Sequence, residues 1–515
     1  MAHFPTLALG VGTISFWLEL YVIRLPGGHA SLLAWTVFLV CLLGLFFNSR
    51  WGVDFRGLFN DESPLSSAFI LTLLLGSVYL AVGLYASLLP PHLVQESDAL
   101  MYHITLPRQH LLRHSFAPIS WSVPDLFLLP LDYALSPFEL STWLPNKLIQ
   151  FIFFMGCLGI VFQLVYILSG RSVQRAWVGT GAIMACHAVA IQVGLAMLDL
   201  VMVYCFLASI HSALIKRWGL AAVEFAFYCW SKTFIPFQMA VIGIILGLIS
   251  YWALRKGFSC CELEFPADRD RRTGIAFFIA ASLGIALPCL VKTFYYTGTP
   301  FYPFGLGFFH PLAQYSVSHW HAILQRAADC VAEKDAYGHG RSLMAFIRHF
   351  WLIAVPEKGV NNAFDYPLGV VYLLVLAPFG AHVFGALKSK KLPVLSLTVV
   401  FWWLTWWFGS QQSRFLLVPV CLMIILTISF LPKLSKVLLV LIVTAMGLEV
   451  VSLINAHRRD WGKPFMAVLR NKDRGLVELK PSTGAEVKLD FPDAAFAAFP
   501  VRVHRNNSVY VMPGF

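Results

Sequence analysis

Apolar runs of about 17–25 residues recur along the whole chain, and this feature limits the fold more than any other. A run of that length, wound as an α-helix, crosses a hydrocarbon core about 30 Å thick. Only 13% of the 515 residues are charged, which is about half the fraction found in a typical soluble protein. Backbone polar groups must be paired internally in lipid, and the runs are continuous rather than alternating. We therefore predict membrane-spanning helices rather than a barrel.

The expected fold is an all-α polytopic membrane protein with about 13 transmembrane helices. The first run has neither the basic start nor the small-residue cleavage site of a signal peptide, so it is expected to remain as a helix. The predicted spans are 5–23, 31–48, 66–89, 146–168, 176–195, 199–215, 218–232, 234–254, 273–292, 366–386, 393–409, 415–431 and 437–454.

Orientation follows from six short basic loops that this count places on one side, which the positive-inside rule makes the cytoplasm. Two long loops, 90–145 and 293–365, then lie on the outward side. Residues 1–454 form the predicted membrane domain. Residues 455–515 form a small extracytoplasmic tail, expected to contain β-structure because it holds alternating segments such as VRVHRNNSVYVM. The basic loops are 50–56, 171–175, 216–217, 255–272, 388–391 and 433–436.

The outward loops are expected to contain amphipathic helices that lie in the membrane interface. In DALMYHITLPRQHLLRH, apolar residues recur at roughly helical spacing beside basic ones, a pattern typical of interfacial helices. The stretch DLFLLPLDYAL predicts another short helix in the same loop. In the second loop, YYTGTPFYPFG is rich in Pro, Gly and aromatic residues and predicts turns at headgroup level.

The stretch QESDALMYH places Glu96, Asp98, Tyr102 and His103 where the chain leaves the membrane. A carboxylate at this boundary, screened from bulk water, can act as a general base toward an acceptor hydroxyl. Glu96 could share a metal with Asp98 or raise its pKa by like-charge repulsion. The alternative is that Ser97 or Asp98 caps the following helix, and capping is likewise the alternative for Asp199. His103 is expected to pack or support, because no His or Cys lies at ligand spacing from it.

Cations gather at the outward helix ends, against the positive-inside bias. An anionic ligand at headgroup depth, such as a lipid phosphate, would give a physical reason to keep them there. The alternative is snorkelling of long side chains toward the headgroups. The residues concerned are Lys147, Lys232, Lys292, Arg341, Arg348 and Arg414.

Several segments, in order, resemble bacterial members of the GT-C superfamily. These are polytopic glycosyltransferases that use polyprenyl-phosphate-linked sugars and are related to protein O-mannosyltransferases and the lipid A aminoarabinose transferase. Ser97 stands where such proteins usually have Trp, and Arg108 where they usually have Lys. The segments, which span about 95–420, are ESDALMYHITLPRQHLL, AMLDLVMVY, CWSKTFIP, YYTGTPFYPF, FDYPLGVVYLLVLAP and GSQQSRFLLVP.

The resemblance implies a catalytic Asp in the first outward loop, and Asp98 holds that position. Glu96, Tyr102, His103 and Asp199 are then expected to support it. A divalent metal is left open, with Glu96 or Asp199 as candidate ligands, and no cofactor is assigned. The residues expected around the donor phosphate are Lys232, Arg341 and Arg414, to which the charge pattern adds Lys292.

The expected function is transfer of a sugar from a polyprenyl-phosphate donor to a hydroxyl of a lipid, glycan or protein acceptor, with inversion. The expected place is the periplasmic face of the bacterial inner membrane. The net charge of +11 needs no nucleic-acid partner, because membrane proteins collect Lys and Arg in cytoplasmic loops. Two alternatives stay open: an O-antigen ligase or polymerase using a pyrophosphate-linked glycan, and a lipid or sugar transporter. The transporter would need polar residues along a path across the bilayer.

Overall fold

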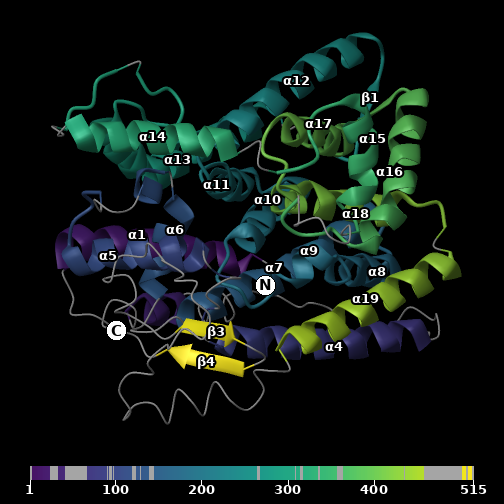
Figure 1. Ribbon diagram of the computed structural model, residues 1–515. Helices are drawn as coiled ribbons and strands as arrows, with labels where there is room; N and C mark the ends of the chain where they lie inside the picture. The colour runs from purple at the N-terminus through teal and green to yellow at the C-terminus, as the bar shows by residue number, and fades with distance from the viewer. Residues whose placement is uncertain are drawn as a thin grey trace.

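The protein is a helical assembly whose long helices carry the composition of membrane spans (Figure 1). Seven helices in the described part of the chain are long and apolar enough to cross a membrane, and five further apolar helices have 10–17 residues. The prediction of a helical membrane protein is therefore confirmed. The computed structural model describes residues 3–23, 33–40, 67–89, 91, 96, 98–118, 123–127, 129–138, 144–263, 267–307, 309–313, 317–333, 337–355, 364–433, 435–457, 501–505 and 508–512.

The first half of the chain contains the elements that surround the first long loop. In order they are α1 (Phe4–Leu18), the π-helical turn η1 (Glu19–Ile23), α4 (Ser67–Leu88), the π-helical turn η2 (Ala99–His103), α5 (Thr105–Arg113), η3 (Val123–Leu126), α6 (Pro130–Leu135), η4 (Ser136–Phe138), α7 (Leu144–Leu168), α8 (Val173–Met184), α9 (His187–Ala190), α10 (Asp199–Leu214) and α11 (Trp218–Cys229).

The second half continues with longer helices and two small sheets. In order they are α12 (Ile235–Arg255), β1 (Ser259–Cys261), α13 (Asp268–Thr297), α14 (Val317–Glu333), α15 (Leu343–Leu352), α16 (Val370–Lys388), β2 (Lys391–Pro393), α17 (Val394–Phe408), η6 (Ser413–Leu416), α18 (Leu417–Phe430), α19 (Lys436–His457), β3 (Val501–Arg505) and β4 (Ser508–Met512).

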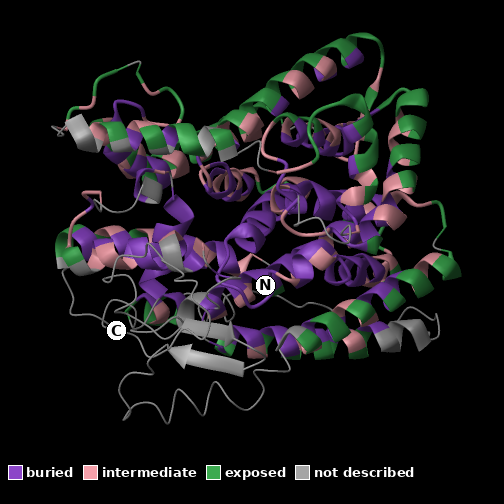
Figure 2. Cartoon of the chain, in the orientation of Figure 1, coloured by how far each residue is buried: buried purple, intermediate pink, exposed green. Residues whose placement is uncertain are grey.

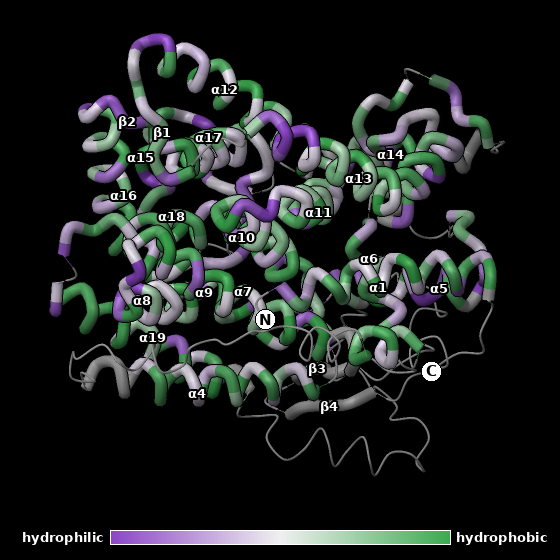
Figure 3. The backbone as a smooth tube through the Cα atoms, turned by 180° about the vertical axis from the view of Figure 1, so that it is seen from behind, coloured by the Kyte–Doolittle hydropathy of each residue, from purple (hydrophilic) through white to green (hydrophobic). Residues whose placement is uncertain are grey.

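Helix α18 is the centre of the fold. In its apolar window 83% of the residues are buried, against 17% for α13, and it packs against α7, α8, α10, α16 and α17. The outer helices α12, α16, α19 and α4 carry exposed residues along their length (Figure 2). Many of these exposed residues are hydrophobic (Figure 3), which suits helices that face lipid rather than water.

The predicted span 176–195 is wrong as a single helix. Helix α8 ends at Met184, Cys186 has extended backbone with ψ 115°, and α9 has only four residues. The reason is a contact from far along the chain: the His187 N–H donates to the Leu368 carbonyl over 3.1 Å. Apolar character alone gave no sign of this break.

Of the helices in the first long loop, α6 is buried within the protein, whereas α5 is buried in part. All six residues of α6 are buried, and α6 packs against α1. Gly12 permits this approach, because a Cβ there would lie 1.7 Å from the Ala134 carbonyl oxygen. In the amphipathic stretch, α5 ends at His114, whose φ is 45°. The expectation of a second short helix is correct, and this helix is covered by protein.

The C-terminal part contains the β-structure that its alternation predicted. Strands β3 and β4 form an antiparallel hairpin in which Val503 pairs with Tyr510. The other alternating pieces, 475–491, lie outside the described residues, as do 41–48 of the predicted second span. A two-stranded parallel pair of β1 and β2, which the sequence did not predict, joins the segments after α12 and α16.

Candidate functional site

The site is organised around Arg414, which η6 presents just before the buried helix α18. Its Nη1 donates to Asp98 Oδ2 over 2.7 Å, and its Nε donates to Gln412 Oε1 over 2.7 Å. The Nε also lies 3.3 Å from Asp365 Oδ2. One guanidinium thus joins the first long loop, the segment before α16 and the start of α18.

A second ion pair lies beside the first. Lys232, after α11, donates to Asp199 Oδ1 at the start of α10 over 3.0 Å. Lys232 Nζ and the Arg414 guanidinium both lie over the Phe415 ring, at 4.8 and 5.5 Å from its centroid. We call Asp98, Asp199, Lys232, Asp365 and Arg414 the carboxylate–cation cluster.

Four side chains of the cluster are partly exposed to solvent, and the fifth, Asp199, is buried. The side chains of Asp98, Asp365, Arg414 and Lys232 keep exposed fractions of 20%, 20%, 17% and 18%, whereas that of Asp199 is only 3% exposed. Within the described residues, Asp199 Oδ2 and Asp365 Oδ2 accept no hydrogen bond. Buried carboxylate oxygens normally find a donor. Asp365 Oδ2 is instead held by its ion pair with Arg414.

The charges of the cluster set different protonation states for two of its carboxyls. Burial raises the pKa of Asp98, but the charges of Arg414 and His103, with hydrogen bonds from Arg414 and Tyr102, lower it below its ordinary value. Burial is the main factor that raises the pKa of Asp365, which is about 6. The charge of Arg414 lowers this pKa, and the charges of Asp199 and Asp98 oppose that effect. Asp98 is thus ionised at neutral pH, whereas the pKa of Asp365 lies close to neutral pH.

Tyr102 and His103 both interact with Asp98. Burial, followed by the charge of Asp98, raises the pKa of the Tyr102 phenol well above its usual value, so Tyr102 stays a neutral donor to that carboxylate. His103 Nδ1 lies 2.5 Å from Asp132 Oδ1 on α6. This bond fixes the imidazole next to the cluster, since the pair is almost fully buried.

The capping alternatives for the two aspartates are wrong. Neither the turn after Asp98 nor helix α10 has a side-chain capping hydrogen bond. Each carboxylate is taken instead by a cation from a distant segment, Arg414 for Asp98 and Lys232 for Asp199. A charged partner outcompetes a capping role because charge-assisted hydrogen bonds are the stronger ones.

Glu96 does not share the site with Asp98. It is fully buried, with Oε2 3.2 Å from Lys147 Nζ and Oε1 accepting the Ala196 N–H over 2.8 Å. Both oxygens are therefore used in holding α7 and the 191–198 segment together. The expectation that Glu96 supports the catalytic Asp or binds a metal is wrong, and Lys147 is satisfied by the same pair.

Lys292 and Arg341 were expected near the donor phosphate, and both make their hydrogen bonds to residues outside the carboxylate–cation cluster. Lys292 donates to Asp125 Oδ1 and to the Tyr133 hydroxyl. It lies inside α13, which extends beyond the predicted span 273–292 at both ends. Arg341 donates to the carbonyls of Trp407 and Gly409. Arg341 therefore holds the end of α17 and the segment that leads to Arg414.

Asp365 and Asp132 are the site residues that the sequence assignment missed. Asp365 follows Phe364 in FDYPLG and has a positive φ of 78°, an uncommon backbone state for a residue other than glycine. Asp132 sits in the apolar stretch DLFLLPLDYAL, where a buried carboxylate signals a partner. Two signals pointed to Asp365: it lies at an outward helix end, and it belongs to one of the segments that carry the resemblance.

A divalent metal held by Glu96 or Asp199 would need further ligands close to either side chain. Across the described residues, no three His, Cys, Asp or Glu side chains converge where they could hold a metal ion. Asp199 keeps one carboxylate oxygen without a hydrogen bond, but a single oxygen does not make a site. The ligand set therefore does not fit a resident divalent metal.

Comparison with known proteins adds no identity. No family model, no curated protein and no solved structure matches this chain.

Proposed function

We propose that the protein is an integral membrane glycosyltransferase that moves a sugar from a polyprenyl-phosphate donor to an acceptor hydroxyl. The proposal includes a span count of about thirteen, an active site on the outward face of the bacterial inner membrane and a role in assembly of a cell-envelope glycan. The membrane character of the helices and the ordered resemblance to the GT-C superfamily support it.

The observation that carries the proposal is the ion pair between Asp98 and Arg414 at a partly exposed site. The pair keeps an ionised base and a phosphate-binding cation side by side. Arg414 uses Nη1 and Nε for Asp98 and Gln412. Its Nη2 donates no hydrogen bond to the described residues, which leaves N–H groups for a phosphate oxygen. Lys232, over the same Phe415 ring, would add a point charge.

In the proposed step the acceptor hydroxyl attacks the anomeric carbon on the face opposite the phosphate. The bond from that carbon to the hydroxyl oxygen forms as its bond to the phosphate oxygen breaks, and the electron pair leaves with the phosphate. The hydroxyl proton passes to Asp98, and the configuration inverts. Arg414 and Lys232 stabilise the charge that develops on the departing phosphate.

The charge balance of the cluster suits proton transfer as well as anion binding. With all groups ionised it holds three carboxylates and two cations, and Asp365 has a pKa of about 6. A phosphate that draws Arg414 toward itself weakens the hold of Arg414 on Asp98. The basicity of Asp98 then rises when the donor binds, which is when a base is needed.

The test uses the purified full-length protein with radiolabelled polyprenyl-phosphate hexose and pentose donors and bacterial membranes as acceptor. We expect Asp98→Asn to lower turnover by about 10²–10⁴-fold, the usual contribution of a general base. The matched control is Asp268→Asn, whose side chain is 79% exposed at the start of α13. Full turnover by the Asp98 variant would sink the base assignment. If the protein used only pyrophosphate-linked glycans as donors, the proposed polyprenyl-phosphate donor would be wrong.

A further inference from the structure

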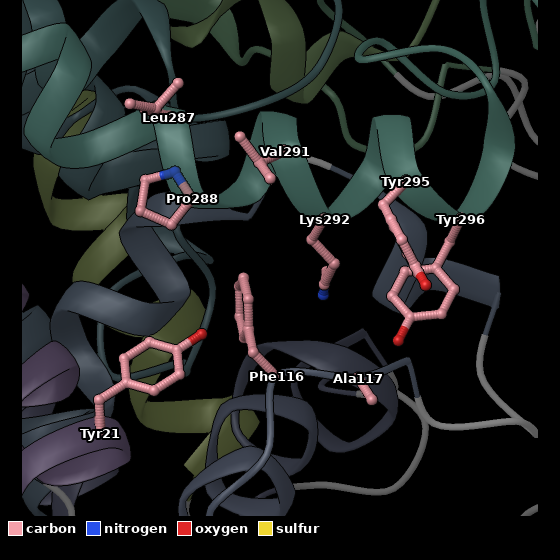
Figure 4. Close-up of a pocket in the computed structure, with 9 residues that line it drawn as sticks. All are labelled: Tyr21, Phe116, Ala117, Leu287, Pro288, Val291, Lys292, Tyr295 and Tyr296. Carbon is pink, nitrogen blue, oxygen red and sulfur yellow. The ribbon is translucent and has the colours of Figure 1, made fainter. Parts of the chain in front are cut away.

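A pocket of about 500 Å³ lies against α13 and takes no part in the carboxylate–cation cluster (Figure 4). Its volume falls within the range of about 300–1,000 Å³ typical of ligand pockets. Residues of η1, of the segment after α5 and of α13 line it, among them Tyr21, Phe116, Val291, Lys292, Tyr295 and Tyr296. Most of the wall is apolar, so the single charged group in it is informative.

That charged group is the ammonium of Lys292, which points into the pocket (Figure 4). It donates to Asp125 Oδ1 over 2.9 Å and to the Tyr133 hydroxyl over 3.1 Å, and it lies 4.3 Å from the Phe116 ring centroid. An ammonium has three N–H groups, so these two bonds leave one for the pocket. The lysine is held in place before any ligand arrives.

The array behind Lys292 carries a net positive charge. His110 Nε2 lies 2.6 Å from Asp125 Oδ1, and His110 Nδ1 lies 2.8 Å from the Ser115 carbonyl. Both ring nitrogens of His110 thus face an oxygen acceptor. Burial raises the pKa of Asp125, but the charges of Lys292 and His110 outweigh it and hold that pKa far below its usual range. Two cations therefore face one carboxylate.

The mouth of the pocket faces the surroundings of a membrane-spanning helix. Leu287, Val291 and Tyr295 follow one another at four-residue spacing on α13, with exposed fractions of 45%, 57% and 45%. Exposed apolar side chains on such a helix contact acyl chains. The pocket thus joins exposed apolar side chains of α13 to the net positive charge of the Lys292, His110 and Asp125 array, and Tyr21, Tyr295 and Tyr296 are among its lining residues.

We propose that this pocket binds an anionic phospholipid of the surrounding membrane, with its headgroup phosphate at Lys292 and an acyl chain along the Leu287–Tyr295 face. Lysine binds phosphate as a point charge, and Tyr21, Tyr295 and Tyr296 bring hydroxyl groups to the headgroup level. The charge excess selects an anionic headgroup over a zwitterionic one. This assignment does not depend on the proposed glycosyl transfer.

The test is native mass spectrometry of the detergent-purified full-length protein titrated with phosphatidylglycerol or phosphatidylcholine of identical chains. We expect phosphatidylglycerol to bind about fivefold more tightly, as expected for one uncompensated charge near a membrane surface. Lys292→Met removes the charge and should abolish the preference. Val291→Trp should fill the pocket and weaken both lipids. Lys433→Met, an exposed lysine beyond α18, is the matched control and should bind like the wild type.

Three outcomes would overturn the proposal. The first is equal binding of the two lipids by the wild type. The second is a phosphatidylglycerol preference that survives both Lys292→Met and Val291→Trp. Lys292 is buried, so its variant could fail to fold. In that case the lipid binding of Val291→Trp, changed at an exposed position, decides whether the pocket is the binding site. The third is displacement of phosphatidylglycerol by polyprenyl phosphate at lower concentration, which would assign the pocket to the lipid carrier.

Discussion

The guanidinium of Arg414 lies 2.7 Å from the carboxylate of Asp98, although 316 positions separate the two residues in the chain. Arg414 belongs to the turn that leads into α18, the most buried of the candidate spans. Asp98 belongs to the first long loop, which α5 and α6 anchor inside the protein. The buried helix α18 therefore fixes the position of Arg414, and the anchored first loop places Asp98 beside it.

Replacing Arg414 should change both the rate and the pH dependence of the proposed reaction. In Arg414→Gln we expect about 10²–10³-fold lower activity, because one charge-stabilising group is lost. The pKa of Asp98 should rise, since burial is no longer opposed by the guanidinium. The acid limb of the kcat/KM profile should then move to higher pH. Arg414→Lys should keep that limb in place at reduced rate, and an unmoved limb in the Gln variant would contradict the pairing.

Replacing Asp365 by Asn should stabilise the protein at neutral pH. The pKa of Asp365 is raised from 3.8 to about 6 in the folded protein, so its contribution to stability is full below about pH 4 and is lost as the pH rises through 6. Asn resembles the protonated form and escapes this loss, which is worth up to about 3 kcal/mol. The measurement is thermal unfolding at pH 4.5 and pH 7.5. The variant should be more stable than the wild type only at pH 7.5. A variant less stable at both would show that the carboxylate is needed by Arg414.

Breaking the Glu96–Lys147 pair should destabilise the fold. Both side chains are fully buried and 3.2 Å apart, and loss of one partner of a buried pair costs about 3–5 kcal/mol. Glu96→Gln and Lys147→Met should each lower the unfolding temperature in detergent. The double variant should lose less than the sum, because no charge is left unpaired. Strict additivity would mean that the two residues do not depend on each other.

Two glycines of α1 offer a matched pair for testing the anchoring of the first loop. A Cβ at Gly12 would lie 1.7 Å from the Ala134 carbonyl, whereas nothing lies within 4 Å of one at Gly10. Gly12→Ala should push α6 away and destabilise by about 1–3 kcal/mol. Gly10→Ala should instead be neutral or stabilising by up to about 1 kcal/mol, since Ala is the better helix former. Equal effects of the two changes, measured by thermal unfolding, would refute the close contact of α1 and α6.

Much of the cluster could be chosen from the sequence, and the rest could not. Asp98, Asp199, Lys232 and Arg414 were selected because charged residues are rare here and gather at helix ends. The same reasoning also selected Glu96 and Lys292, which the structure places in pairs of their own. It placed Asp365 at an outward helix end as well but gave it no role in the site. A charge pattern shows where ionisable groups leave the apolar runs, but it does not show which of them meet.

The sequence by itself determined that this is a helical membrane protein, because long apolar runs satisfy their backbone polar groups within the run itself. That property is local and survives any arrangement of the helices. Only the tertiary structure decided the partners: Arg414 for Asp98, Lys232 for Asp199, Lys147 for Glu96 and Asp125 for Lys292. A buried charge must be paired, but its partner comes from whichever segment packs beside it, and packing depends on the whole chain.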